Sequence, residues 1–364
     1  MEKVFEAHIH HLRDIPLERT INIFAREFEE TGVEGGCFLS VPHAEKGTAE
    51  DYDCLQNLKM LYLKRAFAPK FYAYAALVHP VDYSDKQAIK KDFLRQAKEY
   101  MSVGYDGIKM LEGYPSLLKA RKIPLDDEIY DGFYSFMEEN GYPITIHIAN
   151  PQESWDIRKA TPQLIAAGRI YDDTYPKKED ITAQLFCVMD KYPRLRMAVA
   201  HFGFFIGEKE NAEHFLKDYP NTFFDITPGG GQYFKMLEEW DYWYEFIKRY
   251  QDRIFYGTDF YAFSDENEEN WKIAFWRRPK LVRNFFETDT QHEYVGTPYH
   301  GVKIEKTLRN KIYRENAKHM LGEPKTIDDA YIKSEAERFI NAPYKKYQST
   351  DEDIRFILKN LLCL

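Results

Sequence analysis

Short apolar segments alternate along this chain with segments of helical periodicity. In the helical segments, apolar residues recur every three or four positions and a glycine follows, as at Leu17, Ile21, Phe24, Phe28 and then Gly32. The apolar segments with strand character span residues 3–10, 33–41, 71–79, 105–111, 142–149, 196–203, 222–227 and 253–259. Eight strands in regular alternation with helices predict an α/β fold, the (β/α)8 TIM barrel.

Three segments are longer than such a barrel requires. Residues 150–178 follow the fifth predicted strand, residues 260–300 follow the eighth, and residues 323–364 have helical character. Active sites of these barrels lie at the carboxyl ends of the strands, where the first two segments emerge. We therefore expect long βα loops at the active-site face, a barrel over residues 1–322, and a helical C-terminal extension over residues 323–364 that packs on it.

Charge and composition narrow the classes of partner. The 364 residues carry a formal net charge of −9, and such an acidic surface repels nucleic acid. No apolar run approaches the roughly 20 residues that span a bilayer, and the first residues lack a signal-peptide pattern. The four cysteines are scattered, which is typical of reduced thiols. We therefore expect a cytoplasmic protein that acts on a small molecule, with no nucleic-acid or membrane partner.

Side chains that can bind a metal fall near the ends of four predicted strands. His8 and His10 are two residues apart, so strand alternation directs both into the barrel. His147, His201 and Asp259 take the equivalent inward positions near the ends of the fifth, sixth and eighth strands. Each histidine alone is more often a core residue. Together at one rim, imidazoles and a carboxylate are typical of a catalytic zinc site.

Ordered motifs resemble those of the amidohydrolase superfamily, and within it the amidohydrolase-related, decarboxylase-like branch. The motifs are His-Ile-His at 8–10, Gly-Ile-Lys at 107–109, Pro-Ile-Thr-Ile-His at 143–147, Ala-His-Phe-Gly at 200–203, Tyr-Pro-Asn-Thr-Phe-Phe-Asp at 219–225, Tyr-Gly-Thr-Asp at 256–259 and Ile-Tyr-Arg-Glu-Asn-Ala-Lys-His-Met-Leu-Gly at 312–322. The resemblance covers residues 3–322, and the order of the motifs makes it specific.

The resemblance implies a set of roles. His8, His10, His147 and Asp259 would bind one divalent metal, with Zn²⁺ expected and Mn²⁺ as the alternative. The metal would lower the pKa of a bound water to about 7. Asp259 would accept a proton from that water and pass it to a leaving group, while His201 would contact the water or polarise the substrate oxygen.

Lys109 allows two interpretations. In binuclear members of the superfamily the lysine of the fourth strand is carboxylated and bridges two metals. The simpler interpretation, which we favour, is an unmodified ammonium that pairs with a protein carboxylate or a substrate carboxylate. The sequence also departs from the family at this point, because Met-Leu-Glu at 110–112 replaces the usual Leu-His-Pro and a substrate-contacting histidine is missing.

Further candidates lie around the same rim. His79 ends the third strand, Trp155 follows the fifth and Arg277 follows the eighth. Each is a candidate substrate contact, although packing explains such residues equally well. Asp225 ends the seventh strand and is the candidate acceptor for the second nitrogen of a metal-bound imidazole. The aromatic run at 240–246 is typical either of a homo-oligomer interface or of packing against the barrel.

The sequence favours hydrolysis of a small organic substrate, an amide, lactone or ester, by metal-activated water. The alternative is a lyase of the same branch, a non-oxidative decarboxylase of an aromatic or unsaturated carboxylic acid. Two other classes are weaker. A metal-binding barrel without activity is disfavoured because every catalytic-type position is retained, and a barrel nuclease is disfavoured by the acidic surface.

Overall fold

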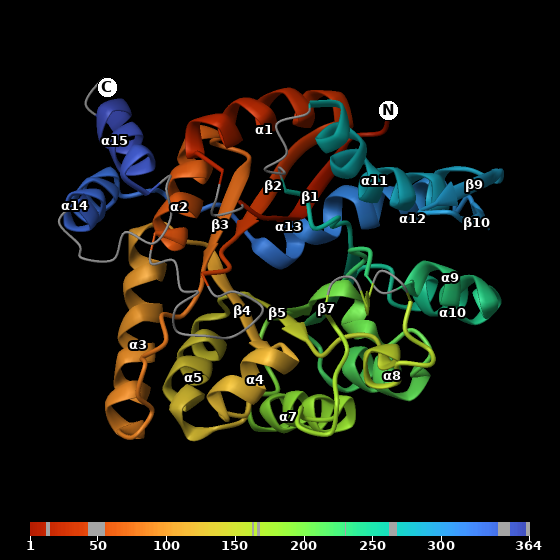
Figure 1. Cartoon of the computed structure of the whole chain (residues 1–364), viewed down its shortest axis with the longest axis horizontal. Helices are drawn as coiled ribbons and strands as arrows, with labels where there is room; N and C mark the ends of the chain where they lie inside the picture. Colours follow the sequence, from red (N-terminus) through yellow and green to blue (C-terminus); the bar gives the residue numbers. More distant parts are fainter. Residues whose placement is uncertain are drawn as a thin grey trace.

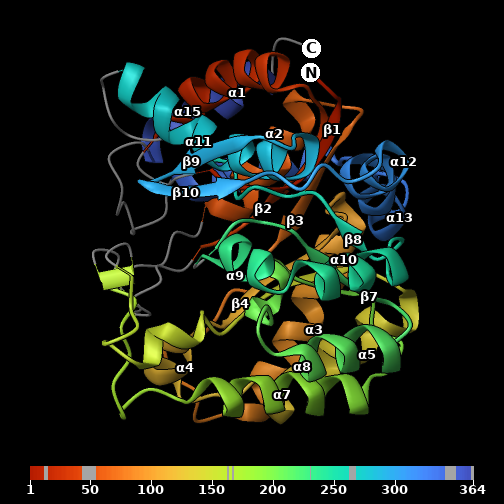
Figure 2. The same ribbon diagram turned by 90° about the vertical axis from the view of Figure 1, so that its right-hand side faces the viewer.

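The computed structural model describes residues 1–11, 15–42, 55–161, 164–165, 168–229, 231–261, 268–340 and 350–361. One parallel sheet forms the centre of the molecule, and its strands lie side by side in chain order (Figures 1 and 2). They are β1 (Val4–Ile9), β2 (Val33–Leu39), β3 (Phe71–Ala75), β4 (Gly107–Gly113), β5 (Ile144–Ile148), β6 (Met197–Val199), β7 (Thr222–Asp225) and β8 (Ile254–Phe255).

The sheet closes where the chain leaves β8. Phe260 forms a parallel bridge with Ile9 of β1. The Phe260 amide donates to the His8 carbonyl and the His10 amide donates to the Phe260 carbonyl, each at 2.8 Å. The predicted eight-stranded TIM barrel is therefore confirmed, and its closing contact lies beside the predicted metal ligands.

Helices lie between the strands and after β8, and α1 has the predicted periodicity. They are α1 (Leu17–Thr31), α2 (Gln56–Ala66), α3 (Lys86–Val103), α4 (Pro115–Arg121), α5 (Asp131–Asn140), α7 (Lys178–Lys191), α8 (Lys209–Asp218), α9 (Gln232–Glu238), α10 (Trp240–Arg249), α11 (Glu268–Glu287), α12 (Lys306–Asn310) and α13 (Asn316–Leu321). Helix α1 ends at Gly32, whose φ of 74° lies in the left-handed region that suits glycine. Asp127 caps the turn before α5 by accepting from the Ile129 amide.

Large side chains fill the barrel interior at its amino-terminal end. This inner cluster comprises Phe5, Ala7, Cys37, Leu39, Tyr72, Tyr74, Ala198, Phe223, Phe255, Ala317, Met320 and Leu321. Helix α13 contributes the last three residues and covers that end, where the Tyr72 hydroxyl also donates to the Gly322 carbonyl at 2.8 Å. The predicted metal ligands lie at the opposite, carboxyl-terminal end of the strands, where barrel active sites form.

Two strands are shorter than predicted, and this moves two site residues off the sheet. Strand β6 ends at Val199 and β8 at Phe255, so His201 and Asp259 lie in the segments that follow. Their φ angles are 56° and 57°, in the left-handed region, which a strand does not contain. The prediction that strand alternation alone turns these two side chains inward was therefore wrong.

The long segments predicted from the sequence have different structures. Residues 150–178 include the short helical turn Gln152–Trp155. The segment after β8 contains α11 and an antiparallel hairpin, β9 (Gln291–Tyr294) and β10 (Thr297–His300), which projects from the barrel (Figure 1). Regular structure thus accounts for most of the described part of that segment.

The C-terminal helices α14 (Asp329–Ile340) and α15 (Thr350–Leu361) pack on α2 and α1 (Figure 1). A buried ion pair joins Asp353 of α15 to Lys59 of α2 at 2.7 Å. The same carboxylate accepts from the Leu17 amide at 2.6 Å and so caps α1. Helicity in this region was expected, and a domain boundary after residue 322 stays a prediction. Among the helices of the described residues, none is long and apolar enough to cross a membrane.

Candidate metal centre

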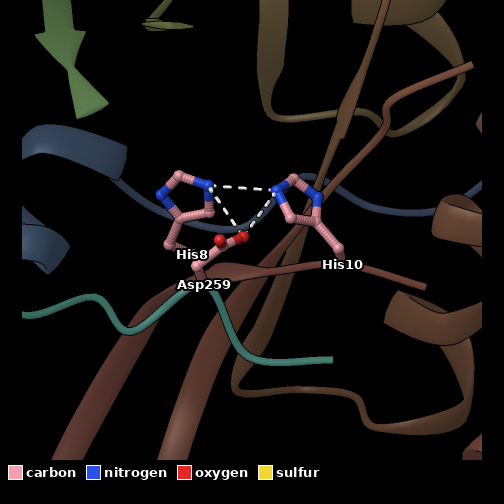
Figure 3. A group of neighbouring side chains, drawn as sticks. All are labelled: His8, His10 and Asp259. Carbon is pink, nitrogen blue, oxygen red and sulfur yellow. Dashed lines mark hydrogen bonds and ion pairs between the residues drawn. The ribbon is translucent and has the colours of Figure 1, made fainter. Parts of the chain in front are cut away.

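Three side chains converge at the carboxyl-terminal mouth of the barrel (Figure 3). The Nε2 atoms of His8 and His10 lie 3.0 Å apart. Asp259 Oδ1 lies 3.8 Å from the first and 3.4 Å from the second. His8 belongs to β1, His10 follows it directly, and Asp259 follows β8, so barrel closure brings the three together.

The outer nitrogen of each imidazole is held by an acceptor. His8 Nδ1 donates to Asp225 Oδ2 at 2.7 Å, which is the contact predicted for Asp225. His10 Nδ1 donates to the Leu39 carbonyl at 2.8 Å. Because each proton is fixed on Nδ1, both Nε2 atoms present lone pairs.

Those two lone pairs and Asp259 Oδ1 face one another, close enough to share one ion. Three acceptors at 3.0–3.8 Å repel unless a cation lies among them. Two imidazoles and a carboxylate are the donor set that Zn²⁺ and related divalent ions prefer. The residues therefore fit a divalent metal.

The charges around the centre keep its ligands in the metal-binding form. Burial lowers the pKa of His8 well below its ordinary value, so the imidazole is neutral. Burial alone would raise the pKa of Asp259, but the positive charge of Arg278 holds it well below the usual range. Arg278, on α11, donates from Nη1 to Asp259 Oδ2 and, at 3.0 Å, to the Asp259 carbonyl.

Glu6 fixes the backbone next to Asp259. Its Oε1 accepts from the Thr258 amide at 2.8 Å and its Oε2 accepts from the Thr258 hydroxyl at 2.6 Å. Oε1 also accepts from the His8 amide at 3.2 Å. One buried carboxylate thus ties β1 to the turn that carries Asp259, whose left-handed backbone needs such support.

His201 lies on a left-handed turn that directly follows β6. His201, Phe202, Gly203 and Phe204 have φ angles of 56°, 53°, 63° and 51°. Three of these residues carry a Cβ, and the left-handed conformation costs about 1–2 kcal/mol of conformational free energy for each, or about 3–6 kcal/mol together. At the start of the turn, the His201 amide donates to Asp225 Oδ1 at 2.7 Å. Strain of this size is typical of functional sites.

The His201 ring lies beside the convergent group. Its centroid is 5.5 Å from that of His8 and 5.0 Å from that of His147. Burial lowers the pKa of His201 to about 3, so the ring is neutral at physiological pH. Its Nδ1 is buried without a hydrogen-bond partner among the described residues. A neutral imidazole in this state is suited to contact water or a substrate.

His147 lies next to His201 but outside the convergent group. Its Nε2 donates to the Ala149 carbonyl at 2.9 Å, which leaves the lone pair on Nδ1. Its ring also contacts Tyr114, with centroids 5.1 Å apart. The structure brings together His8, His10 and Asp259, and the ligand role of His147 stays a prediction.

Lys109, on β4, is 2% exposed. Burial lowers the pKa of its ammonium to about 8, although the negative charges of Asp225 and Asp259 favour the charged form. Within the described parts of the chain, no hydrogen bond or ion pair reaches its Nζ, so the predicted pairing with a nearby protein carboxylate is not seen there.

The other predicted contacts are engaged elsewhere. His79 bonds to Glu112 and to the Tyr83 hydroxyl, each at 2.8 Å, and its side chain is buried. Trp155 donates to the Pro176 carbonyl at 3.1 Å. Arg277 is exposed, with its guanidinium 5.9 Å from the ring centre of a hairpin tyrosine. Their substrate-binding roles stay predictions.

Sequence reasoning missed the adjacent Arg278, which reaches Asp259. The two arginines are neighbours on a helix, so their side chains point about 100° apart. The family motif of the eighth strand ends at Asp259 and therefore does not indicate which arginine faces the site. Deciding which face of α11 packs on the barrel would have distinguished Arg278 from Arg277.

Comparison with known proteins agrees with the fold. An uncharacterised TIM-barrel protein from Bordetella bronchiseptica has 13% identity and a TM-score of 0.56, covering 88% of this chain and 98% of that one. A dihydroxybenzoic acid decarboxylase from Polaromonas with bound manganese and the inhibitor 2-nitroresorcinol has 15% identity and a TM-score of 0.52, and the match covers 88% of this chain and 97% of that one. The 4-oxalomesaconate hydratase from Rhodopseudomonas palustris has 14% identity and a TM-score of 0.51, and the match covers 92% of this chain and 99% of that one. No curated protein matches.

A family comparison reaches further than the fold. The amidohydrolase family model matches residues 35–322, which include His147, His201 and Asp259 and begin after His8 and His10. The match covers most of the chain, and the ordered motifs and the donor set at the barrel mouth agree with it. This chain therefore belongs to the amidohydrolase family of metal-dependent enzymes.

Proposed function

We propose that this protein is a metal-dependent hydrolase of a small organic substrate, an amide, lactone or ester. The observation that carries the proposal is the convergence of His8, His10 and Asp259 beside His201, whose ring is neutral and whose Nδ1 has no hydrogen-bond partner among the described residues. When bound there, a divalent cation supplies Lewis acidity, which polarises an oxygen atom and makes water acidic enough to act near neutral pH. Zn²⁺ is the expected ion and Mn²⁺ the alternative.

Asp259, His201 and His147 would have different roles in the reaction. Asp259 is held by Arg278 through Oδ2, so Oδ1 faces the two imidazoles and is the atom that would take up a proton. His201 would donate a hydrogen bond to the substrate oxygen, because its ring is neutral and has a free nitrogen. His147 would complete the ligand set through Nδ1, since Nε2 is already bonded to a carbonyl.

A non-oxidative decarboxylase of an aromatic or unsaturated carboxylic acid is the second candidate. The buried Lys109 ammonium favours it, because no anion among the described residues pairs with Nζ and a substrate carboxylate would supply one. In that reaction the site would deliver a proton to carbon rather than direct water at a carbonyl.

Turnover by purified, Zn²⁺- or Mn²⁺-loaded protein separates the two reactions. Substrates are panels of lactones, esters and amides on one side and hydroxybenzoates on the other. A hydrolase releases one acid equivalent per ester or lactone cleaved, and His201→Asn removes that activity while His292→Asn, on the exposed hairpin, retains it. Carbon dioxide release without hydrolysis would establish the second candidate instead. Absence of turnover on both panels by metal-loaded protein would contradict both.

A further inference from the structure

The left-handed turn after β6 has a second anchor, outside the barrel mouth. Lys178, the first residue of α7, is 2% exposed, and its Nζ donates to the Phe204 carbonyl at 2.7 Å. The same ammonium pairs with the Glu208 carboxylate. Burying an ammonium is costly unless its partners are fixed, so this contact is a specific feature of the fold.

Phe204 connects that anchor to His201. It is the last of the four left-handed residues, and its ring stacks on the His201 imidazole, with centroids 5.1 Å apart and planes 11° from parallel. The first of these residues is held by Asp225, which also holds His8. The turn is therefore fixed at its start by the carboxylate that orients a metal ligand, and at its end by Lys178.

We propose that Lys178 is a positioning residue for His201, and that its bond to the Phe204 carbonyl keeps the strained turn and the stacked imidazole in place beside the metal centre. The bond gives a buried carbonyl of the left-handed turn a fixed donor. Without it, the strained residues can relax toward ordinary backbone angles, and the ring that they carry moves. The inference rests on the proposed role of His201 in turnover.

Lys178→Met removes the ammonium and keeps most of the side-chain volume. The matched control is Lys64→Met, because Lys64 is also 2% exposed and donates to two carbonyls, those of Gly104 and Lys325, each at 2.8 Å. Lys64 lies near the end of α2, which leads into β3, and so at the opposite end of the barrel from the metal centre. The pair therefore separates loss of a buried ammonium from loss of support for the turn.

Two readouts test the proposal in Zn²⁺-loaded protein. In histidine-labelled protein, the ring resonances of His201 are identified by their loss in His201→Asn. Lys178→Met is expected to shift them, because the stacked Phe204 ring moves, while Lys64→Met leaves them unchanged. With a substrate from the panels above, Lys178→Met is expected to lower kcat at least tenfold with KM changed less than threefold. Lys178→Arg, which keeps a donor, is expected to recover at least a third of the wild-type kcat.

Unchanged His201 resonances in folded, Zn²⁺-loaded Lys178→Met would overturn the proposal, as would kcat within twofold of wild type. Equal losses in Lys178→Met and Lys64→Met would also overturn it, since a structural effect would then suffice. If Lys178→Met does not fold, Lys178→Gln is measured in its place, with the same expected shift and the same refuting result. Because the resonances require no substrate, failure of the proposed hydrolysis leaves this test intact.

Discussion

Asp225 gives the sharpest prediction, because its two oxygens bond to different parts of the site. Oδ1 accepts from the His201 and Thr227 amides at 2.7 and 3.1 Å, and Oδ2 accepts from His8 Nδ1 at 2.7 Å. In Asp225→Asn the two amides hold the carbonyl oxygen of the new side chain on their side. The NH₂ group then faces His8 Nδ1 and favours the tautomer with the proton on Nε2, which removes the lone pair that a metal needs.

The size of the effect follows from the partners that remain. Loss of such a supporting acceptor typically costs 10- to 100-fold in metal affinity, or about 1.4–2.8 kcal/mol. The Thr227 hydroxyl, 3.2 Å from His8 Nδ1, is a second acceptor that preserves part of the original tautomer. We therefore expect Zn²⁺ affinity to fall about tenfold, near the lower end of that range.

Competition between the protein and a fluorescent zinc chelator measures this change. Asp190→Asn is the control, because Asp190 also accepts a short hydrogen bond, from the Tyr219 hydroxyl at 2.6 Å, but lies on the surface helix α7. Its affinity is expected to equal that of the wild type. If folded Asp225→Asn binds Zn²⁺ within twofold of the wild type, the argument that Asp225 sets the His8 tautomer is wrong.

Three further predictions concern ligands and stability. His147→Ala is expected to lower bound metal, measured by elemental analysis after dialysis; full occupancy would refute its ligand role. Asp259→Asn is expected to abolish turnover in a steady-state assay, and near-normal rates would exclude it as the proton acceptor. Lys59→Met leaves the buried Asp353 carboxylate without its cation and should destabilise the fold by about 3 kcal/mol in urea unfolding, whereas a loss under ~0.5 kcal/mol would contradict a structural role for this pair.

Much of the fold follows from local sequence patterns. Apolar runs located all eight strands, since a barrel strand buried on both faces must be apolar, and glycines such as Gly32 marked helix ends. The strand ends were harder to place. His201 and Asp259 leave the sheet because contacts with Asp225, Thr258 and Glu6 hold a left-handed backbone, and those contacts join residues far apart in the chain.

The site was predictable where a motif names the residue and its place on a strand. The pair His8 and His10 and the acceptor Asp225 are of this kind, and the structure places all three together. Arg278 and Lys178 are different, because a basic residue on a helix is usually solvated and no local pattern marks it as buried. Only the packing of α11 and α7 around the barrel gives them their partners.

The central claim is that His8, His10 and Asp259 hold one divalent cation. Anomalous diffraction from crystals of the Zn²⁺-loaded protein tests it directly. We predict a single strong peak about 2.0–2.2 Å from both imidazole Nε2 atoms and from a carboxylate oxygen of Asp259. A peak elsewhere, or none at this point while the two Nε2 atoms remain 3.0 Å apart, would contradict the claim.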